Sequence, residues 1–83
     1  MTGPEREEFA RRAEDLYAAR LKADLEREHM GEYVAIELES GDYFLGRTTR
    51  DVVKAARRAY PDRLTYVMRV GRRAAIHFGA YSR

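Results

Sequence analysis

The sequence contains no cysteine, only two histidines and no long apolar run, and each absence excludes a class of protein. Without cysteine there are no disulfides, no thiolate nucleophile and no cysteine-ligated zinc, and the composition suits a reducing compartment. His29 and His77 alone do not complete a closed metal site, so we expect neither metal nor cofactor. The short apolar runs exclude a membrane-spanning helix, and residues 1–9 lack the hydrophobic segment of a signal peptide. We therefore expect a cytoplasmic protein without a membrane partner.

The 83 residues allow one small domain, residues 1–83, which buries only about 60% of its unfolded surface. Its net charge of +2 is unevenly distributed along the chain. Residues 1–42 carry 12 acidic and 6 basic side chains, a net of −6, and residues 43–83 carry 2 and 10, a net of +8. An acidic half and a basic half favour pairing with a complementary protein surface, including a second copy of the chain.

A long charged helix is predicted for about residues 4–28, with Pro4 in its first turn. Its apolar residues recur every three or four positions and form one stripe. A helix of about 24 residues is roughly 36 Å long, whereas a typical strand spans only about 17–20 Å. The stripe therefore either folds back on the protein's own sheet or forms a partner-binding surface. The candidate partner-binding residues are Phe9, Leu16, Tyr17, Leu21 and Leu25.

About residues 32–79 predict a ββαβ unit with a small, mainly antiparallel sheet, so the fold class is α+β. Residues 33–38 and 43–46 are rich in strand formers and flank a short turn, which predicts an antiparallel hairpin. Thr48 or Thr49 begins a second helix. Residues 64–70 alternate as a third strand.

The third strand lies either beside the second, in parallel, or beside the first, in the order 2-1-3. We favour 2-1-3 because the first strand is the longest of the hairpin and the most apolar. Residues 74–78 form either a fourth strand or an irregular flap. We expect the second helix to cover the face made by Val34, Ile36 and Leu38, with the opposite face solvated or covered by the first helix. The residues expected to shape the turns are Gly31, Gly41, Asp42, Gly46, Pro61 and Asp62.

Three acidic residues cluster about the hairpin and are candidates for acid–base chemistry: Glu37, Glu39 and Asp42. Such pairs work when their environments separate their pKa values, but acids on and beside a turn are usually solvated. We therefore predict no enzymatic activity. Asp42 is expected to accept hydrogen bonds from nearby backbone amides of the turn, and His29 to complement the dipole at the end of the first helix.

Basic residues gather on one arc of the second helix. Counted from Val52 at 100° per residue, Arg50, Lys54, Arg57 and Arg58 lie at about 160°, 200°, 140° and 240°. Such an arc contacts phosphates, contacts an acidic protein surface or is simply solvated. The arc holds neither aromatic residues for base stacking nor Asn or Gln for base reading, so an acidic surface is favoured over nucleic acid. Arg47 and Arg63 flank the helix on either side.

Residues 28–37 (EHMGEYVAIE) and 40–48 (SGDYFLGRT) resemble a group of short uncharacterised bacterial proteins. Their shared pattern, E-H-x-G-E-Y/F-V-A-I and then S-G-D-Y-x-x-G, continues here with YPD at 60–62 and RVG at 69–71. This chain departs from the pattern at residues 72–73, where it has two arginines and relatives tend to carry an aromatic. Relatives are encoded beside aspartic-protease-like or toxin-like genes, so the resemblance implies an antitoxin-like or companion role.

The sequence therefore predicts a protein-interaction module that acts by binding another protein and that also self-associates, with a dimer favoured. The long helix is expected to supply the contact. The alternative is a nucleic-acid-binding protein that uses the basic arc of the second helix.

Overall fold

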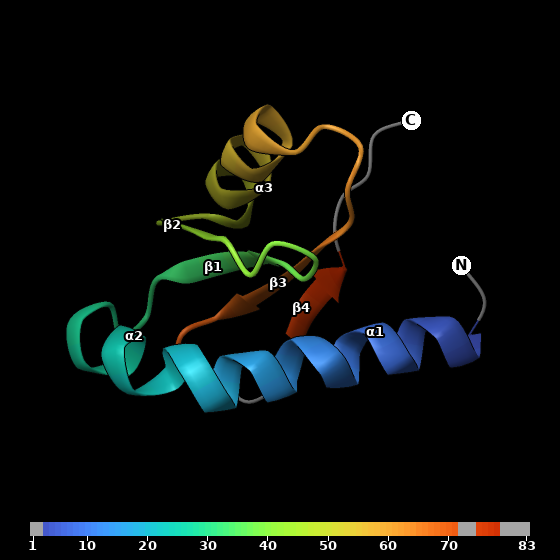
Figure 1. Cartoon of the computed structure of the whole chain (residues 1–83). Helices are drawn as coiled ribbons and strands as arrows, with labels where there is room; N and C mark the ends of the chain where they lie inside the picture. The colour runs from blue at the N-terminus through green and yellow to red at the C-terminus, as the bar shows by residue number, and fades with distance from the viewer. Residues whose placement is uncertain (1–2, 72–74, 79–83) are drawn as a thin grey trace.

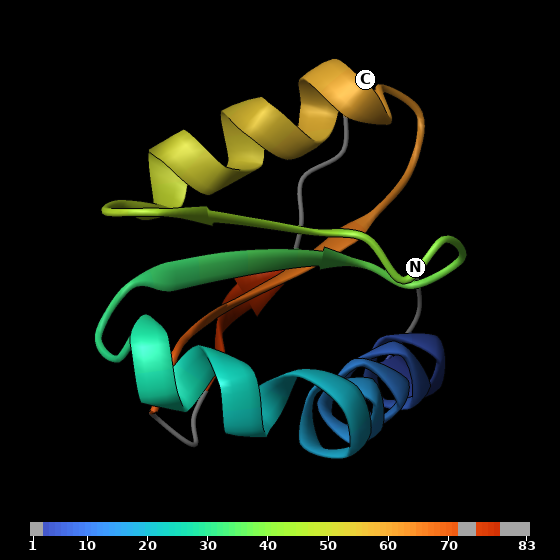
Figure 2. The same ribbon diagram turned by 60° about the vertical axis from the view of Figure 1, so that its left-hand side comes forward.

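The computed structural model describes residues 3–71 and 75–78, and it confirms an α+β fold. A long helical segment comes first, made of α1 (Gly3–Leu16), the π-helix η1 (Tyr17–Leu21) and α2 (Lys22–Glu28). The second part contains β1 (Tyr33–Glu37), β2 (Tyr43–Gly46), α3 (Thr49–Ala59), β3 (Thr65–Arg69) and β4 (Ala75–Phe78). The sheet lies between the N-terminal helix and α3 in a three-layer arrangement (Figures 1 and 2).

The sheet has the order β2-β1-β3-β4, and each neighbouring pair is antiparallel. Val34 of β1 lies opposite Leu45 of β2 on one side and Met68 of β3 on the other. The predicted order 2-1-3 is confirmed, and residues 75–78 form the strand that the sequence left open. The two arginines at residues 72–73, Ala74 and the end of the chain lie outside the described residues.

The N-terminal helix covers the face of the sheet that we had assigned to the second helix. Val34 and Ile36 are fully buried beneath it, in one core cluster with Leu21 and Leu25, and Leu38 packs against the edge of that cluster. The prediction was wrong because alternation shows which residues share a face but not which helix lies on it. The longer apolar stripe takes the face with the larger side chains.

Helix α3 covers the opposite face, which is neither solvated nor covered by the first helix. Val52 and Ala56 of α3 pack against Ala35 of β1 and Val67 of β3. Thr48 is the N-cap of α3, and its hydroxyl accepts a hydrogen bond from the Asp51 amide at 3.1 Å. This cap is the kind that the sequence predicted.

The five-residue π-helix η1 keeps the apolar stripe on the sheet. On a regular α-helix, residues four apart rotate by about 40° per step, so the stripe from Ala13 to Leu25 would drift by about 120°. The wider turn of a π-helix offsets part of that drift. Ala13, Tyr17, Leu21 and Leu25 consequently all reach the same core cluster.

The long helical segment is not straight and does not lie along the sheet over its whole length. Helix α2 turns away from the direction of α1, and the N-terminal end of α1 extends past the sheet (Figure 1). Phe9 and Leu16 pack against the core cluster, and the Phe9 ring meets the Tyr66 ring edge-on at 6.3 Å. The apolar stripe is thus largely used within the chain, and residues 3–8, which reach beyond it, are exposed and carry no large apolar side chain.

The predicted turn residues lie where the chain changes direction. Gly31 and Gly41 have φ angles of 90° and 81°, a region that side chains with a Cβ rarely adopt. Gly46 serves another purpose, because a Cβ there would lie 3.0 Å from the Asp51 Cβ and 3.1 Å from a Val52 methyl. Its missing side chain lets α3 approach β2 closely. Pro61 and Asp62 form an exposed turn after α3.

We expect Thr65→Val to stabilise the protein. The Thr65 hydroxyl on β3 is buried and has no hydrogen-bond partner among the described residues. Valine keeps the shape and removes the unsatisfied polar atom, so the free energy of unfolding should rise by about 1 kcal/mol. Urea unfolding followed by circular dichroism measures the change. Thr65→Ser, which keeps the hydroxyl and removes a methyl group, should lower it, and a less stable valine variant would contradict the prediction.

Candidate functional site

Helix α3 presents a basic surface because its opposite face is fixed to the sheet. Val52 and Ala56 are fully buried beneath the helix. The four cations of the predicted arc are all exposed: Arg50, Lys54, Arg57 and Arg58. Tyr60 follows the last turn and anchors the end of the helix, as described below. The sequence located these cations correctly because their angular positions depend only on the helix itself.

Three of the four cations surround one open hollow. Arg50, Lys54 and Arg57 line it together with Val53, and its volume is about 360 Å³. Val53 is half-buried and packs against the core beneath α3, so it forms an apolar floor. Arg58 does not line this hollow. We call these four lining residues the α3 basic hollow.

The cations of the α3 basic hollow have no carboxylate partner in the part of the chain that the structure describes. Cations elsewhere are often compensated. Arg11, Lys22 and Arg27 form ion pairs with carboxylates of their own helical segment. Arg63, which we had grouped with the arc, pairs with Glu37 and Glu39 of the hairpin instead. The positive charge of α3 is thus concentrated where it faces solvent.

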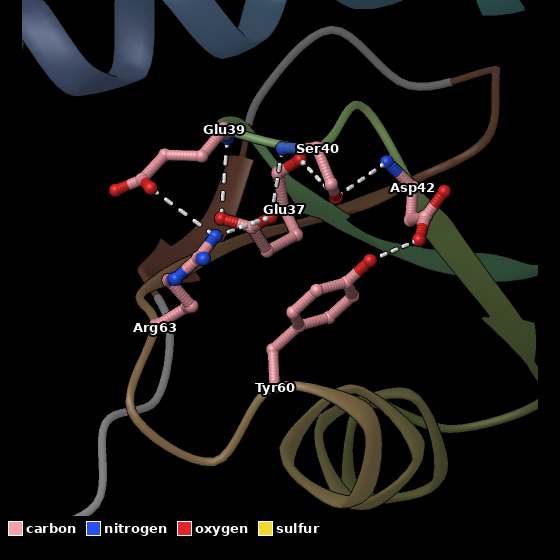
Figure 3. A network of polar contacts seen from close by, with 6 residues as sticks. All are labelled: Glu37, Glu39, Ser40, Asp42, Tyr60 and Arg63. Atoms are coloured by element: carbon pink, nitrogen blue, oxygen red, sulfur yellow. Dashed lines mark hydrogen bonds and ion pairs between the residues drawn. The ribbon is translucent and has the colours of Figure 1, made fainter.

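A second polar cluster lies at the β1–β2 turn, and Figure 3 shows its six residues. Glu37 is only 1% exposed, although we expected the acids of this turn to be solvated. Its carboxylate accepts hydrogen bonds from the backbone amides of Ser40 and Glu39, at 2.9 and 3.1 Å. Arg63 donates to it at 3.2 Å and also lies 3.2 Å from the Glu39 carboxylate. The prediction failed for Glu37 because its partner, Arg63, is distant in sequence, whereas Glu39 and Asp42 are exposed as expected.

The environment of Glu37 holds it in the charged form. Burial alone would raise the pKa of Glu37, but hydrogen bonds from Ser40, from the Glu39 amide and from Arg63 outweigh it and lower the pKa below its ordinary value of 4.5. An ionised carboxylate has no proton to donate at neutral pH, and here it holds the turn together. The adjoining hollow carries both signs of charge, on Arg12 and Asp62 among others.

Asp42 and Tyr60 connect this turn to α3. The Tyr60 hydroxyl donates to the Asp42 carboxylate, and the Tyr60 ring meets the Phe44 ring edge-on at 6.3 Å. We expected Asp42 to accept from backbone amides, but the Ser40 hydroxyl does so instead, accepting from the Asp42 amide at 3.0 Å. The end of α3 is thereby tied to the start of β2, which fixes the direction in which the basic hollow faces.

The apolar residues proposed as a contact surface on the long helix are largely used inside the chain. Tyr17, Leu21 and Leu25 are buried in the core, and Phe9 and Leu16 are half-buried against it. Burial and a hydrogen bond to Glu26 at 3.0 Å raise the pKa of the Tyr17 hydroxyl.

Two further groups at the edge of this layer are also paired. Burial and a 2.7 Å bond to Glu14 raise the pKa of Tyr66. His29 ends α2 as predicted, and its Nδ1 lies 3.0 Å from a Glu32 oxygen.

No protein-family model matches the chain, and comparisons with curated proteins and with solved structures also give no match. Within residues 3–71 and 75–78, no three histidine or acidic side chains are grouped as metal ligands. In the same residues no helix is both long and apolar enough to cross a bilayer. The α3 basic hollow and the surfaces beside it are therefore the candidate functional surfaces of the described chain.

The depressed pKa of Glu37 predicts a loss of stability in acid. Above pH 4.5 the carboxylate is ionised in both the folded and the unfolded chain, and its hydrogen bonds contribute fully. As the pH falls through the lower folded pKa, the folded form must take up a proton and this contribution is lost. Glu37→Gln should therefore cost about 1–3 kcal/mol at neutral pH and make stability less sensitive to pH below 4.5.

Denaturant unfolding at several pH values between neutral and acidic measures both effects. Glu39→Gln removes an exposed carboxylate of the same cluster and should keep the wild-type dependence on pH. An unchanged acid dependence in the Glu37 variant would show that the buried carboxylate is not its source.

Proposed function

We propose that the protein is a non-enzymatic interaction module whose α3 basic hollow binds an acidic segment of a partner protein. The observation that supports this proposal is that Arg50, Lys54 and Arg57 surround an apolar floor and have no counter-charge among the described residues. A surface of this kind gains most from a ligand that brings both carboxylates and an apolar side chain. This role agrees with the companion or antitoxin-like function that the resemblance implies.

The spacing of the cations defines the kind of segment that would fit. Arg50 and Arg57 are seven residues apart in α3, which is about 10 Å along the helix axis. Two carboxylates four residues apart on an extended chain lie on one face of it, about 13 Å apart, which the two long arginine side chains can span. Each guanidinium can hold a carboxylate through two parallel hydrogen bonds. An apolar side chain between the two acids would then lie over Val53.

A nucleic acid is the competing partner, because uncompensated arginines also bind phosphates. The character of the surface favours protein. The hollow has an apolar floor, and its lining includes no amide or aromatic side chain. Tyr60, the aromatic residue closest in sequence, is already engaged with Asp42 and Phe44. Residues outside the hollow would thus have to stack on the bases and read their edges.

Charge reversal in the hollow tests the proposal. A fluorescein-labelled peptide that contains Glu-Ser-Leu-Ser-Glu, which puts both acids and the leucine on one face of an extended chain, should bind the wild-type protein at low salt, as followed by fluorescence anisotropy. Arg50→Glu combined with Arg57→Glu should weaken the affinity at least about tenfold, since each arginine contributes a charge-assisted contact. The matched control is Arg12→Glu with Arg20→Glu, which makes the same change in net charge on exposed residues of the N-terminal helix.

The same titration with a labelled DNA duplex and a single-stranded RNA separates the two partner classes. Binding to nucleic acid but not to the peptide, with a logarithmic salt slope of about −3 for three phosphate contacts, would establish the competing function. Equal losses in the test and control variants would show that only the overall charge matters and would contradict a site at the hollow.

A further inference from the structure

Strand β2 has an open edge, since it pairs with β1 on one side and with no described strand on the other. The Glu37 amide bonds to the Asp42 carbonyl, so by alternation Asp42, Phe44 and Gly46 direct their backbone groups to β1. Tyr43 and Leu45 then direct theirs to the open edge. An unpaired row of this kind is a template for another strand. The Tyr43 side chain beside it is 41% exposed.

One flank of α3 lies above this edge. The helix begins near Gly46 and runs back until Tyr60 reaches Asp42, so it is antiparallel to β2 (Figure 2). Counted from Val52, Asp51, Ala55 and Arg58 lie at about 260°, 300° and 240°. The closeness of Asp51 to Gly46 shows that this flank is the one on the β2 side. Neither Asp51 nor Arg58 forms an ion pair with a described residue.

We propose that two copies of the chain pair through β2 in antiparallel fashion, with their α3 helices side by side. A twofold interface uses the same patch from both copies, so the patch must be complementary to itself. The flank of α3 meets that condition, because its acid and its base lie on either side of the small Ala55. Turning one copy about the axis brings Asp51 of each copy opposite Arg58 of the other.

The strand and the helix are consistent with a single axis. Because Tyr43 and Leu45 carry the free backbone groups, antiparallel pairing can be centred on Tyr43, Phe44 or Leu45, and the last two are the ones that lie beneath the middle of α3. Asp51 lies over Gly46 and Tyr60 reaches Asp42, so the middle of α3, near Ala55, lies over the same two residues. One twofold axis therefore passes through the centre of both elements.

The spacing also fits. Helix α3 contacts β2 and β1 about equally and β3 less, so the two helices of a dimer would be between two and three strand spacings, about 10–14 Å, apart. Packed helices are usually about 8–10 Å apart, and the long Arg58 side chain can span the additional distance to Asp51 of the second copy. A register centred on Leu45 places Phe44 across from Gly46 of the second copy. It also places Tyr43 across from Arg47 of the second copy, which allows a cation–π contact.

This interface replaces the one expected from the sequence. Self-association was predicted through the apolar stripe of the long helix, and that stripe is now largely buried in the core. The new interface does not depend on the proposed function, since Arg50, Lys54 and Arg57 lie outside the flank that faces the second copy. The Arg50→Glu, Arg57→Glu variant should accordingly stay dimeric even if it no longer binds the acidic peptide.

A charge swap tests the pairing by sedimentation velocity. The wild-type protein should be a dimer. The dimer contains two Asp51–Arg58 pairs, one on each side of the axis. Asp51→Arg or Arg58→Asp alone turns both pairs into pairs of like charge and should weaken the dimer at least about tenfold. The two changes together exchange the charges and should restore it. Asp15→Arg, on an exposed part of α1, is the control for net charge and should remain dimeric. Circular dichroism verifies that each variant is folded.

Amide hydrogen exchange identifies the strand. The Tyr43 and Leu45 amides should be protected in the dimer and exchange faster in the single variants. Should an α3 variant fail to fold, Tyr43→Lys places a charge at the same edge and should itself give a monomer. A wild-type monomer at about 1 mM protein, or a dimer whose Tyr43 and Leu45 amides exchange freely, would overturn the proposal.

Discussion

Strand β1 is buried on both faces and paired along both edges, and the other elements are positioned against it. Its larger side chains, Val34 and Ile36, face the N-terminal helix, while Ala35 faces α3. A small residue at that point lets α3 approach the sheet closely. The same approach needs Gly46 on β2. The position of the basic surface thus depends on the smallest residue of each paired strand, Ala35 in β1 and Gly46 in β2.

The charged groups divide into those that hold the fold and those that remain available. The buried carboxylate of Glu37 closes the turn at the end of β1, and Tyr60 ties that turn to α3. Neither needs a ligand to explain it. The hollow and the flank of α3 are different, because their charges have no partner among the described residues. One helix therefore offers two surfaces, one suited to an acidic partner and one complementary to itself.

The local sequence pattern was sufficient to predict the helices and strands, but it was insufficient to predict how they pack against one another. The hairpin, the Thr48 cap and the basic arc follow from neighbouring residues, and all three are present in the structure. The choice of helix for each face is decided by packing volume, which alternation does not encode. Glu37 and Arg63 are 26 residues apart, so the burial of that carboxylate had no local signal. The buried residues of the first helix, from Ala13 to Leu25, are spaced by four throughout. This regular spacing was the sign of the π-helix that the sequence offered.

The π-helix also makes the number of residues in the first helix part of the fold. A π-turn is an α-helix with one residue more than the regular ladder accommodates. Loss of one residue from 17–21 would restore a regular α-helix and leave the segments before and after it in nearly the same relative orientation. Loss of a residue elsewhere in α1 has no such outlet and would rotate everything before it by about 100°. Phe9 would then turn away from the core it shares with Tyr66. The π-turn is thus the place where this helix can change its length without changing which face lies on the sheet.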